Sequence, residues 1–198
     1  MGRDELLQDE ARESQLASEA VDTKSTVDLS STTRDDFPGF LGVTRTAQVP
    51  RVVLDRDWGK APPALIWRVP CGSGWSGFAV VNGVAITQEQ RRGQQVVVAR
   101  SLADGAELWR DAQDGAYYSN LAGDGPRATP YVHGGLVYAC GPFGRLTCLD
   151  GRDGAVVWTK DLREMYGLTK ERAQTLISYG RAASPIVHDG RLIVEAGG

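Results

Sequence analysis

The sequence predicts an all-β protein made of short antiparallel strands joined by tight turns. Glycine is abundant, with 24 residues in a chain of 198, and tight turns use glycine because its backbone readily adopts positive φ. Short apolar runs flank dipeptides of the Asn-Gly, Gly-Gly and Asp-Gly type, which are the preferred turns of β-hairpins. A third observation, an internal repeat, indicates how these strands are grouped.

The first repeated unit is a hairpin that occurs three times. Residues 129–137 align with residues 184–192, and residues 77–85 form a weaker third copy. Each copy reads as a short strand, a two-residue turn and a second strand. Self-similarity at a fixed period is the sequence signature of repeat architectures, so each hairpin is expected to belong to one structural unit.

A second repeated unit interleaves with the hairpins and ends in tryptophan. Residues 99–109 align without gaps on residues 148–158, and both copies contain an Asp-Gly turn before the closing Trp109 or Trp158. Trp67 closes what looks like an earlier, degenerate copy. The three tryptophans are 42 and 49 residues apart, which matches the roughly 40–50 residues of a four-stranded propeller blade.

Together the two units predict a β-propeller of four-stranded antiparallel blades. A single four-stranded sheet cannot bury both of its faces, whereas radial stacking buries the faces of neighbouring sheets against each other. A large aromatic residue that recurs once per blade is suited to packing between neighbours. We therefore interpret four residues as structural docking residues: Gly105, Trp109, Gly154 and Trp158.

The repeats also predict that the propeller is incomplete. About three to four blades are recognisable, and the last repeat stops before its closing tryptophan. A closed propeller usually needs at least about four blades. We expect the chain to be a fragment of a longer protein that supplies the missing blades.

The composition divides the chain into two regions. Residues 1–36 hold ten acidic and four basic side chains and almost no aromatic residue. Such a segment buries too little apolar surface to offset the entropy lost on ordering. We predict an acidic, disordered or weakly helical tail over residues 1–36 and propeller repeats over residues 37–198.

The docking pattern resembles that of a known family. In residues 148–158 a small residue, an Asp, a Gly and a Trp follow at the spacing of the tryptophan-docking motif of pyrroloquinoline-quinone (PQQ)-like propellers. That group includes quinoprotein dehydrogenases and the outer-membrane assembly factor BamB. The resemblance covers about residues 36–198, and it implies an extracytoplasmic, periplasmic location.

Three functions remain open from the sequence. The first is a non-catalytic scaffold that binds a protein or an extended polymer, with no catalytic or metal-binding residues assigned. The second, implied by the resemblance, is a PQQ-dependent dehydrogenase with PQQ and calcium as cofactors; the chain has no adjacent cysteines and no recognisable calcium-binding carboxylate cluster. The third is a hydrolytic or lyase propeller, which two histidines and no activated nucleophile argue against. We favour the scaffold.

Loops that enter the inner strands predict a binding surface around the propeller axis. The loop at 115–120 and an insertion at 161–180 both precede an inner strand, and the insertion is expected to hold one or two short helices, with Thr169 capping the second. Insertions in repeat arrays often map to the binding face. The candidate partner-binding residues are Trp75, Gln88, Glu89, Tyr117, Arg127, Tyr179 and Arg181.

Charge and hydropathy bear on three questions: whether the protein binds nucleic acid, whether it crosses a membrane and whether it is secreted. The net charge is −3, which does not favour nucleic acid or an anionic membrane surface. No apolar run is long enough to span a membrane. The N-terminus lacks the apolar core of a secretory signal, so either the protein is cytoplasmic or the chain lacks its original beginning.

Overall fold

The computed structural model describes residues 27–49, 51–169, 172 and 179–196. Three antiparallel sheets account for all strands in these residues. The first sheet comprises β1 (Ala79–Val81), β2 (Val84–Arg91), β3 (Gln94–Ser101) and β4 (Glu107–Asp114). The second comprises β5 (Tyr131–His133), β6 (Leu136–Cys140), β7 (Arg145–Asp150) and β8 (Val156–Asp161). The third comprises β9 (Ile186–His188) and β10 (Arg191–Ile193).

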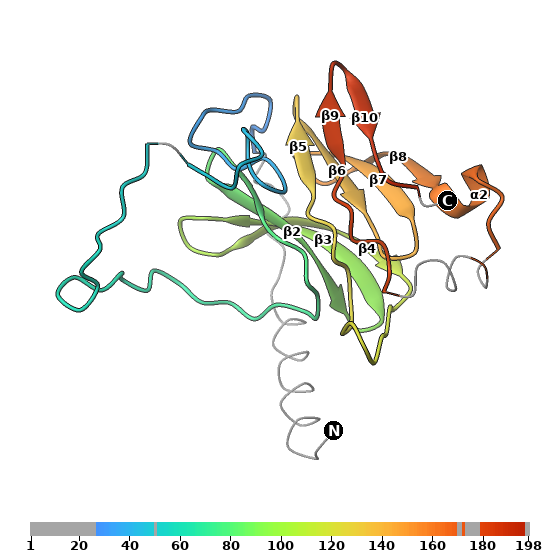
Figure 1. Cartoon of the computed structure of the whole chain (residues 1–198), viewed down its shortest axis with the longest axis horizontal. Coiled ribbons are helices and arrows are strands. Elements are labelled where there is room, and N and C mark those ends of the chain that lie inside the picture. Colours follow the sequence, from blue (N-terminus) through green and yellow to red (C-terminus); the bar gives the residue numbers. More distant parts are fainter. Residues whose placement is uncertain (1–26, 50, 170–171, 173–178, 197–198) are drawn as a thin grey trace, which may run out of the picture.

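The sheets have the topology of propeller blades. In each sheet the strands follow one another in chain order, and every strand pairs with its sequence neighbour. The first strand of each sheet contacts the first strand of the next, β1 with β5 and β5 with β9. Figure 1 shows the first and second sheets stacked and the β9–β10 hairpin beside β5. The predicted β-propeller fold is confirmed, and in the described residues the blades form a row, not a closed ring.

The predicted hairpin turns are confirmed in detail. Both turn residues have positive φ at 82–83 (48° and 76°), at 134–135 (58° and 82°) and at 189–190 (47° and 69°). Positive φ at both positions defines the type I′ turn, whose twist matches that of the flanking strands. A fourth turn of this kind, at Arg92 (49°) and Gly93 (79°), joins β2 to β3; the sequence did not reveal it because arginine is uncommon there.

An apolar core fills the space between the first two sheets. Its members are small and branched side chains from both sheets, one indole, and Leu29 from the segment before the first sheet. The cluster consists of Leu29, Ala79, Val81, Val84, Ile86, Val97, Ala99, Trp109, Val132, Val137, Ala139 and Leu149. A smaller second cluster lies between the second and third sheets, where Leu192 and Val194 pack against it. Stacking therefore buries sheet faces, as the repeat predicted.

The segment before the first sheet lies along the inner strands. Phe37 and Val80 exchange two backbone hydrogen bonds of 2.7 Å each, and the Leu29 side chain is only 1% exposed. Residues 1–26 of the predicted tail lie outside the described residues, but residues 27–36 contact the sheets. One buried leucine and a few backbone hydrogen bonds hold this otherwise polar segment, and the tail over residues 1–36 stays a prediction.

The insertion at 161–180 begins with one helical turn. α2 (Leu162–Met165) starts at Asp161, whose carboxylate accepts a hydrogen bond from the Arg163 backbone N–H at 2.8 Å. The Thr169 hydroxyl accepts a bond from the backbone N–H of Arg172 at 3.2 Å, as expected of a helix cap. The helix predicted after Thr169 falls largely on residues outside the described ranges. No helix in the described ranges is long and apolar enough to cross a membrane.

Candidate functional site

Trp109 fixes the first blade to the second. The indole is 3% exposed, and its Nε1 donates a hydrogen bond to the Gly151 carbonyl at 2.9 Å. Its ring lies over Gly154, where an added Cβ would be 2.7 Å from the indole Cε3, and Gly154 has φ +76°. Both the close approach and the left-handed backbone require glycine at this position.

Trp67 makes the same contact one unit earlier. Its Nε1 donates to the Leu102 carbonyl at 2.8 Å, and a Cβ on Gly105 would be 2.8 Å from its ring. Trp67 therefore occupies the position of a closing tryptophan, as the spacing predicted. Trp158, the third copy, is half-buried and packs beside Tyr138 with a ring-centroid distance of 6.2 Å.

A row of hydroxyl contacts also links successive blades. The Gly77 N–H donates to the Thr129 hydroxyl at 3.1 Å, and the Thr129 N–H donates to the Ser184 hydroxyl at 2.9 Å. These three residues occupy equivalent positions in the three hairpin repeats. The repeat therefore encodes contacts between blades as well as strands within them.

Gln88 takes part in this inter-blade bonding and does not reach the surface. It is 6% exposed, and its Nε2 donates to the Ala128 carbonyl at 2.6 Å and to the Cys140 carbonyl at 3.3 Å. The sequence had grouped Gln88 with the candidate binding surface. The structure places it between two blades because β2 is buried on both faces.

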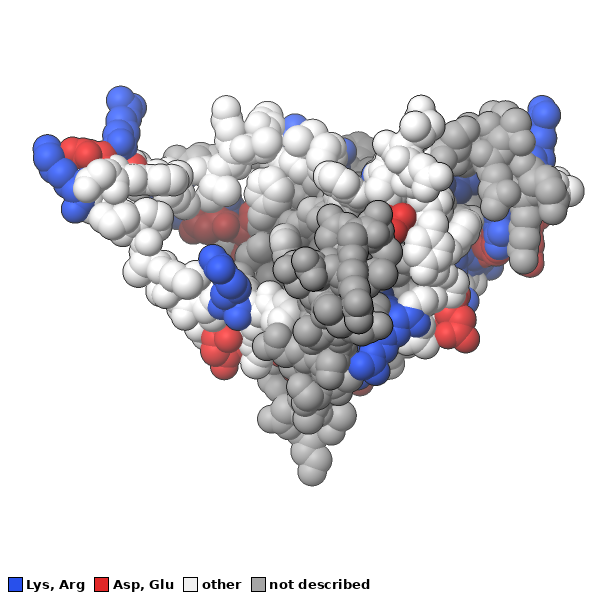
Figure 2. Space-filling view, turned by 90° about the horizontal axis from the view of Figure 1, so that it is seen from below, with Lys and Arg blue, Asp and Glu red and all other residues white. Residues whose placement is uncertain are grey.

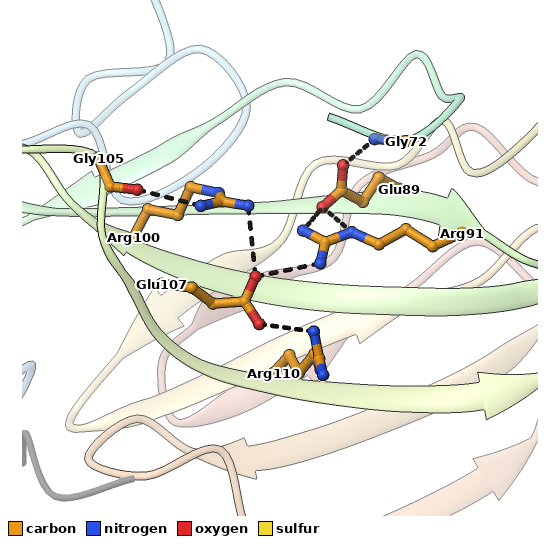
Figure 3. Close-up of polar contacts among 7 residues, drawn as sticks. All are labelled: Gly72, Glu89, Arg91, Arg100, Gly105, Glu107 and Arg110. Atoms are coloured by element: carbon orange, nitrogen blue, oxygen red, sulfur yellow. Dashed lines mark hydrogen bonds and ion pairs between the residues drawn. The ribbon is translucent and has the colours of Figure 1, made fainter. Parts of the chain in front are cut away.

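Glu89 lies in a buried network of charges on the other face of the first sheet (Figure 3). Glu89 is 3% exposed; it accepts hydrogen bonds from the Gly72 N–H and from the Arg91 guanidinium. Arg91 also approaches Glu107, with 3.1 Å between Nη1 and Oε2. Like Gln88, Glu89 differs from its predicted surface position, because its charge is compensated inside the protein.

Glu107 is the centre of this network. Two further guanidinium groups approach its carboxylate, Arg100 at 3.3 Å from Oε2 and Arg110 at 3.1 Å from Oε1. Burial lowers the pKa of Arg91, but the charges of Glu89 and Glu107 and their hydrogen bonds outweigh this effect and leave the pKa raised. Opposite charges therefore compensate one another within this buried network.

Arg127 organises a second polar cluster, on the loop side of the blades. Its Nε donates to the Tyr179 carbonyl at 2.7 Å, and its Nη2 donates to the carbonyls of Gly123, at 2.8 Å, and Ala122. The guanidinium carbon lies 6.0 Å from the centre of the Tyr117 ring. One side chain thus ties together the loop at 115–125 and the chain that enters the third blade.

Exposed aromatic and apolar side chains surround Arg127. Trp75 is 65% exposed and Tyr179 is 57% exposed. The Trp75 indole packs against Gly123, where a Cβ would be 2.6 Å from Nε1. Tyr118 and Leu121, which were not among the predicted binding residues, are exposed on the same loop. We call this set of residues the Arg127 face: Trp75, Tyr118, Leu121, Arg127 and Tyr179.

Two other predicted residues lie beneath this face. Tyr117 is 8% exposed, and its ring meets Phe143 edge-on at a centroid distance of 5.6 Å. Arg181 is 5% exposed; its Nη1 donates to the Glu195 carbonyl at 3.1 Å. The structure therefore brings Trp75, Arg127 and Tyr179 together at the surface and leaves Tyr117 and Arg181 in the interior.

A pocket of about 190 Å³ lies between the first two sheets. Asp111 and Arg145 line it together with Gln95 and Phe143. Burial raises the pKa of Asp111, against the lowering effects of its hydrogen bond from Gln113 and of the Arg145 charge. This pocket could not be predicted from the sequence, because its lining residues come from different blades.

The described residues contain no group of three or more His, Cys, Asp or Glu side chains that is placed to bind a metal. Cys71, Cys140 and Cys148 form no disulfide bond with one another, and burial raises the pKa of Cys140 to about 11, against the lowering effect of Arg181. On the face shown in Figure 2, acidic and basic side chains form small separate groups with uncharged surface between them.

Comparison with known proteins places these features in a family. A family model described as outer membrane protein assembly factor BamB matches residues 92–198, more than half of the chain. A quinohemoprotein alcohol dehydrogenase from Pseudomonas putida HK5 is 24% identical, with a TM-score of 0.43; the match covers 65% of this chain and 18% of that one. BamB from Moraxella catarrhalis is 17% identical, with a TM-score of 0.34, and the match covers 61% and 45%. The chain therefore spans less than half the length of either protein, and no curated protein matches it significantly.

Proposed function

Because this chain belongs to the family described as outer membrane protein assembly factor BamB, we propose that it is a non-catalytic β-propeller scaffold. Its proposed role is to bind a protein, or another extended polymer, in an extracytoplasmic compartment such as the periplasm. The Arg127 face is the proposed binding surface.

The observation that carries this proposal is the combination of exposed aromatic side chains with a fixed backbone. Trp75 and Tyr179 expose more than half of their surface, while Arg127 holds three backbone carbonyls of the surrounding loops. Aromatic and arginine side chains dominate the energetics of protein interfaces. A preorganised loop surface loses little entropy when a partner binds.

The charge of Arg127 indicates which chemical groups a partner would carry. Arg127 makes no ion pair with any residue that the structure describes, and its Nη1 atom donates no hydrogen bond to them. Its positive charge is therefore available to a carboxylate or carbonyl oxygen of a partner. Together with the aromatic side chains, this favours an extended peptide that carries acidic and aromatic residues.

The quinoprotein alternative requires a different set of groups. The described carboxylates form no cluster that is placed to bind calcium. The buried carboxylates of Glu89 and Glu107 already form ion pairs with buried arginines. The described residues therefore do not fit a calcium site with PQQ.

The test is peptide binding to the whole chain. Synthetic decapeptides that differ in their content of Asp, Glu, Phe and Trp would be titrated against the protein by fluorescence anisotropy. We expect acidic, aromatic peptides to bind best, and Trp75→Ala to weaken that binding about tenfold or more, as for a hot-spot residue. Trp58→Ala is the matched control, because Trp58 is 53% exposed on the segment that projects away from the sheets in Figure 1.

Two outcomes would count against the scaffold. Equal losses in the Trp75 and Trp58 variants would mean that the Arg127 face is not the binding surface. Stoichiometric, calcium-dependent binding of PQQ in a parallel titration would move the dehydrogenase ahead of the scaffold.

A further inference from the structure

The pocket between the first two sheets lies between two blades that each have all four strands. Its described walls come from β2, β3 and β4 of the first sheet and from β6, β7 and β8 of the second, with the start of α2 at one side. Its volume is about 190 Å³. A cavity of about 150 Å³ holds a benzene molecule, so this pocket has room for about eight non-hydrogen atoms.

The pocket forms where the apolar contact between the two sheets gives way to polar side chains. Val97 of β3 belongs to the core, but Asp111, directly opposite it on β4, is polar. On the second sheet Leu149 of β7 belongs to the core, and Thr147 lies two residues before it. Side chains two residues apart in a strand share a face, so Asp111 and Thr147 both lie on the faces that meet between the sheets.

Asp111 places an incompletely compensated carboxylate on one wall of the pocket. The Gln113 Nε2 atom donates a hydrogen bond to its Oδ2 at 2.7 Å. Its Oδ1 accepts no hydrogen bond, and the carboxylate forms no ion pair, within the described ranges. Burial raises the pKa of Asp111, against the lowering effects of the Gln113 hydrogen bond and of the Arg145 charge. This direction indicates a carboxylate that has lost water without gaining a close counter-charge.

Arg145 places an unpaired positive charge on the opposite wall. It stands opposite Asp161 in the pairing of β7 with β8, but the Asp161 carboxylate is bound by Arg163, with 2.6 Å between Nη2 and Oδ2. The Arg145 side chain is left without an ion pair or hydrogen bond to the residues that the structure describes. Arg145 is exposed, so it lies at the mouth of the pocket. Its charge still acts on Asp111, although the two groups form no direct ion pair.

The buried end of the pocket offers one hydroxyl group and apolar surface. Thr147 is 4% exposed, and its hydroxyl makes no hydrogen bond to another described residue. Buried hydroxyl groups in native proteins normally have a hydrogen-bond partner, so a ligand with a polar atom at this point would fit. Ala139, Pro142 and Phe143 also line the pocket and provide contact for a few carbon atoms.

We propose that this pocket binds a small zwitterion, an α-amino acid with a short aliphatic side chain, whose ammonium group bonds to Asp111 and whose carboxylate bonds to Arg145. A ligand with one charge would match only one of these two groups, whereas a zwitterion matches both. The apolar lining and the available volume favour a side chain of a few carbon atoms. The pocket contains no residue of the Arg127 face, and this proposal does not depend on the function proposed for that face.

The test is a ligand-observed NMR titration of the whole chain with L-valine and two of its fragments. 3-Methylbutanoate lacks the ammonium group, and 2-methylpropylamine lacks the carboxylate. We expect valine to bind about tenfold or more tightly than either fragment, because each fragment loses one charge-assisted hydrogen bond. Absence of valine binding, as for a pocket that holds only water, would overturn the proposal. Valine binding no tighter than that of a fragment would overturn it as well.

Two conservative variants assign the contacts. Asp111→Asn should weaken valine and the amine about tenfold or more and should not weaken 3-methylbutanoate. Arg145→Gln should weaken valine and 3-methylbutanoate to a similar degree and should not weaken the amine. The matched controls are Asp189→Asn and Arg191→Gln, at exposed residues of the β9–β10 hairpin, and they should change no affinity.

This crossed pattern separates direct contact from a general disturbance of the fold, which would weaken all three ligands alike. Thermal melts of each variant show whether it is folded. Unchanged valine affinity in either pocket variant would overturn the assignment. An equal loss of all three ligands in both folded variants would also overturn it, because neither charge would then recognise a particular group of the ligand.

Discussion

The two faces of the first sheet bury side chains of opposite chemistry. The face toward the second sheet carries Ile86, Val97 and Trp109, which belong to the apolar core. The other face carries Glu89 and Glu107 with Arg91 and Arg100, all less than 8% exposed. Alternation of side chains along β2, β3 and β4 separates the two sets completely.

The difference follows from what covers each face. The apolar face meets another blade, and close packing of the two sheets needs only matching shapes. The charged face is covered by the irregular segment around Trp67 and Gly72, whose backbone contributes to the polar network; the Gly72 N–H donates to Glu89. Equivalent tryptophan contacts thus stabilise two interfaces, that of Trp109 with the second sheet and that of Trp67 with the first. One depends on apolar area, and the other depends on every charge keeping its partners.

Removal of the apolar docking residue should have the largest effect. Trp109→Ala empties a fully packed site and leaves the Gly151 carbonyl without its donor. We expect the free energy of unfolding to fall by about 4–5 kcal/mol, the upper part of the range for large-to-small core substitutions. Urea denaturation followed by circular dichroism measures it. Trp67→Ala, at a half-buried copy, should cost clearly less; an equal cost would show that the two docking sites are equivalent.

Neutralisation of the Glu107 carboxylate should cause the second-largest loss of stability. Glu107→Gln leaves Arg91 and Arg100 buried without that negative charge. The expected loss is about 3 kcal/mol, the lower end of the range for a broken buried ion pair, because the amide oxygen still accepts a hydrogen bond. The control is Glu164→Gln, at an exposed acidic residue, and it should change stability by less than about 0.5 kcal/mol. A similar small change in Glu107→Gln would mean that the charges do not stabilise this face.

The smallest effect concerns the turn that receives Trp109. Hydrogen bonds from the Arg152 side chain and backbone hold the pKa of Asp150 at about 2. A carboxyl group with a lowered folded-state pKa contributes stability above its unfolded pKa and loses it as pH falls through the folded value. We expect a small loss between about pH 4 and pH 2. Thermal melts across this range should show it in the wild type and not in Asp150→Asn; identical profiles would contradict it.

Local sequence was enough to predict the blades because their signals are short-range. The turns at 82–83, 134–135 and 189–190 and the contact of Trp109 with Gly154 depend on residues within one repeat or its neighbour. Their backbone angles and spacing leave few alternatives. Trp67, in a degenerate copy, was recognisable from its spacing alone.

The candidate surface was less predictable. Gln88 and Glu89 are polar residue types that usually lie at the surface. Both are buried here, because segments far apart in the sequence supply their hydrogen-bond partners. Tyr118 and Leu121 were missed, since an isolated loop sequence does not show which apolar side chains stay exposed. The grouping of Trp75, Arg127 and Tyr179 remains a prediction about function, although the structure places the three residues together.

The sequence by itself determined the repeat, the turns and the docking tryptophans, because these follow from backbone geometry and short spacings. Only the tertiary structure decided which polar side chains are buried and which apolar side chains stay exposed. Burial of Glu89 and exposure of Leu65 depend on which distant segments pack nearby. That packing is a property of the whole fold and leaves no local pattern in the sequence.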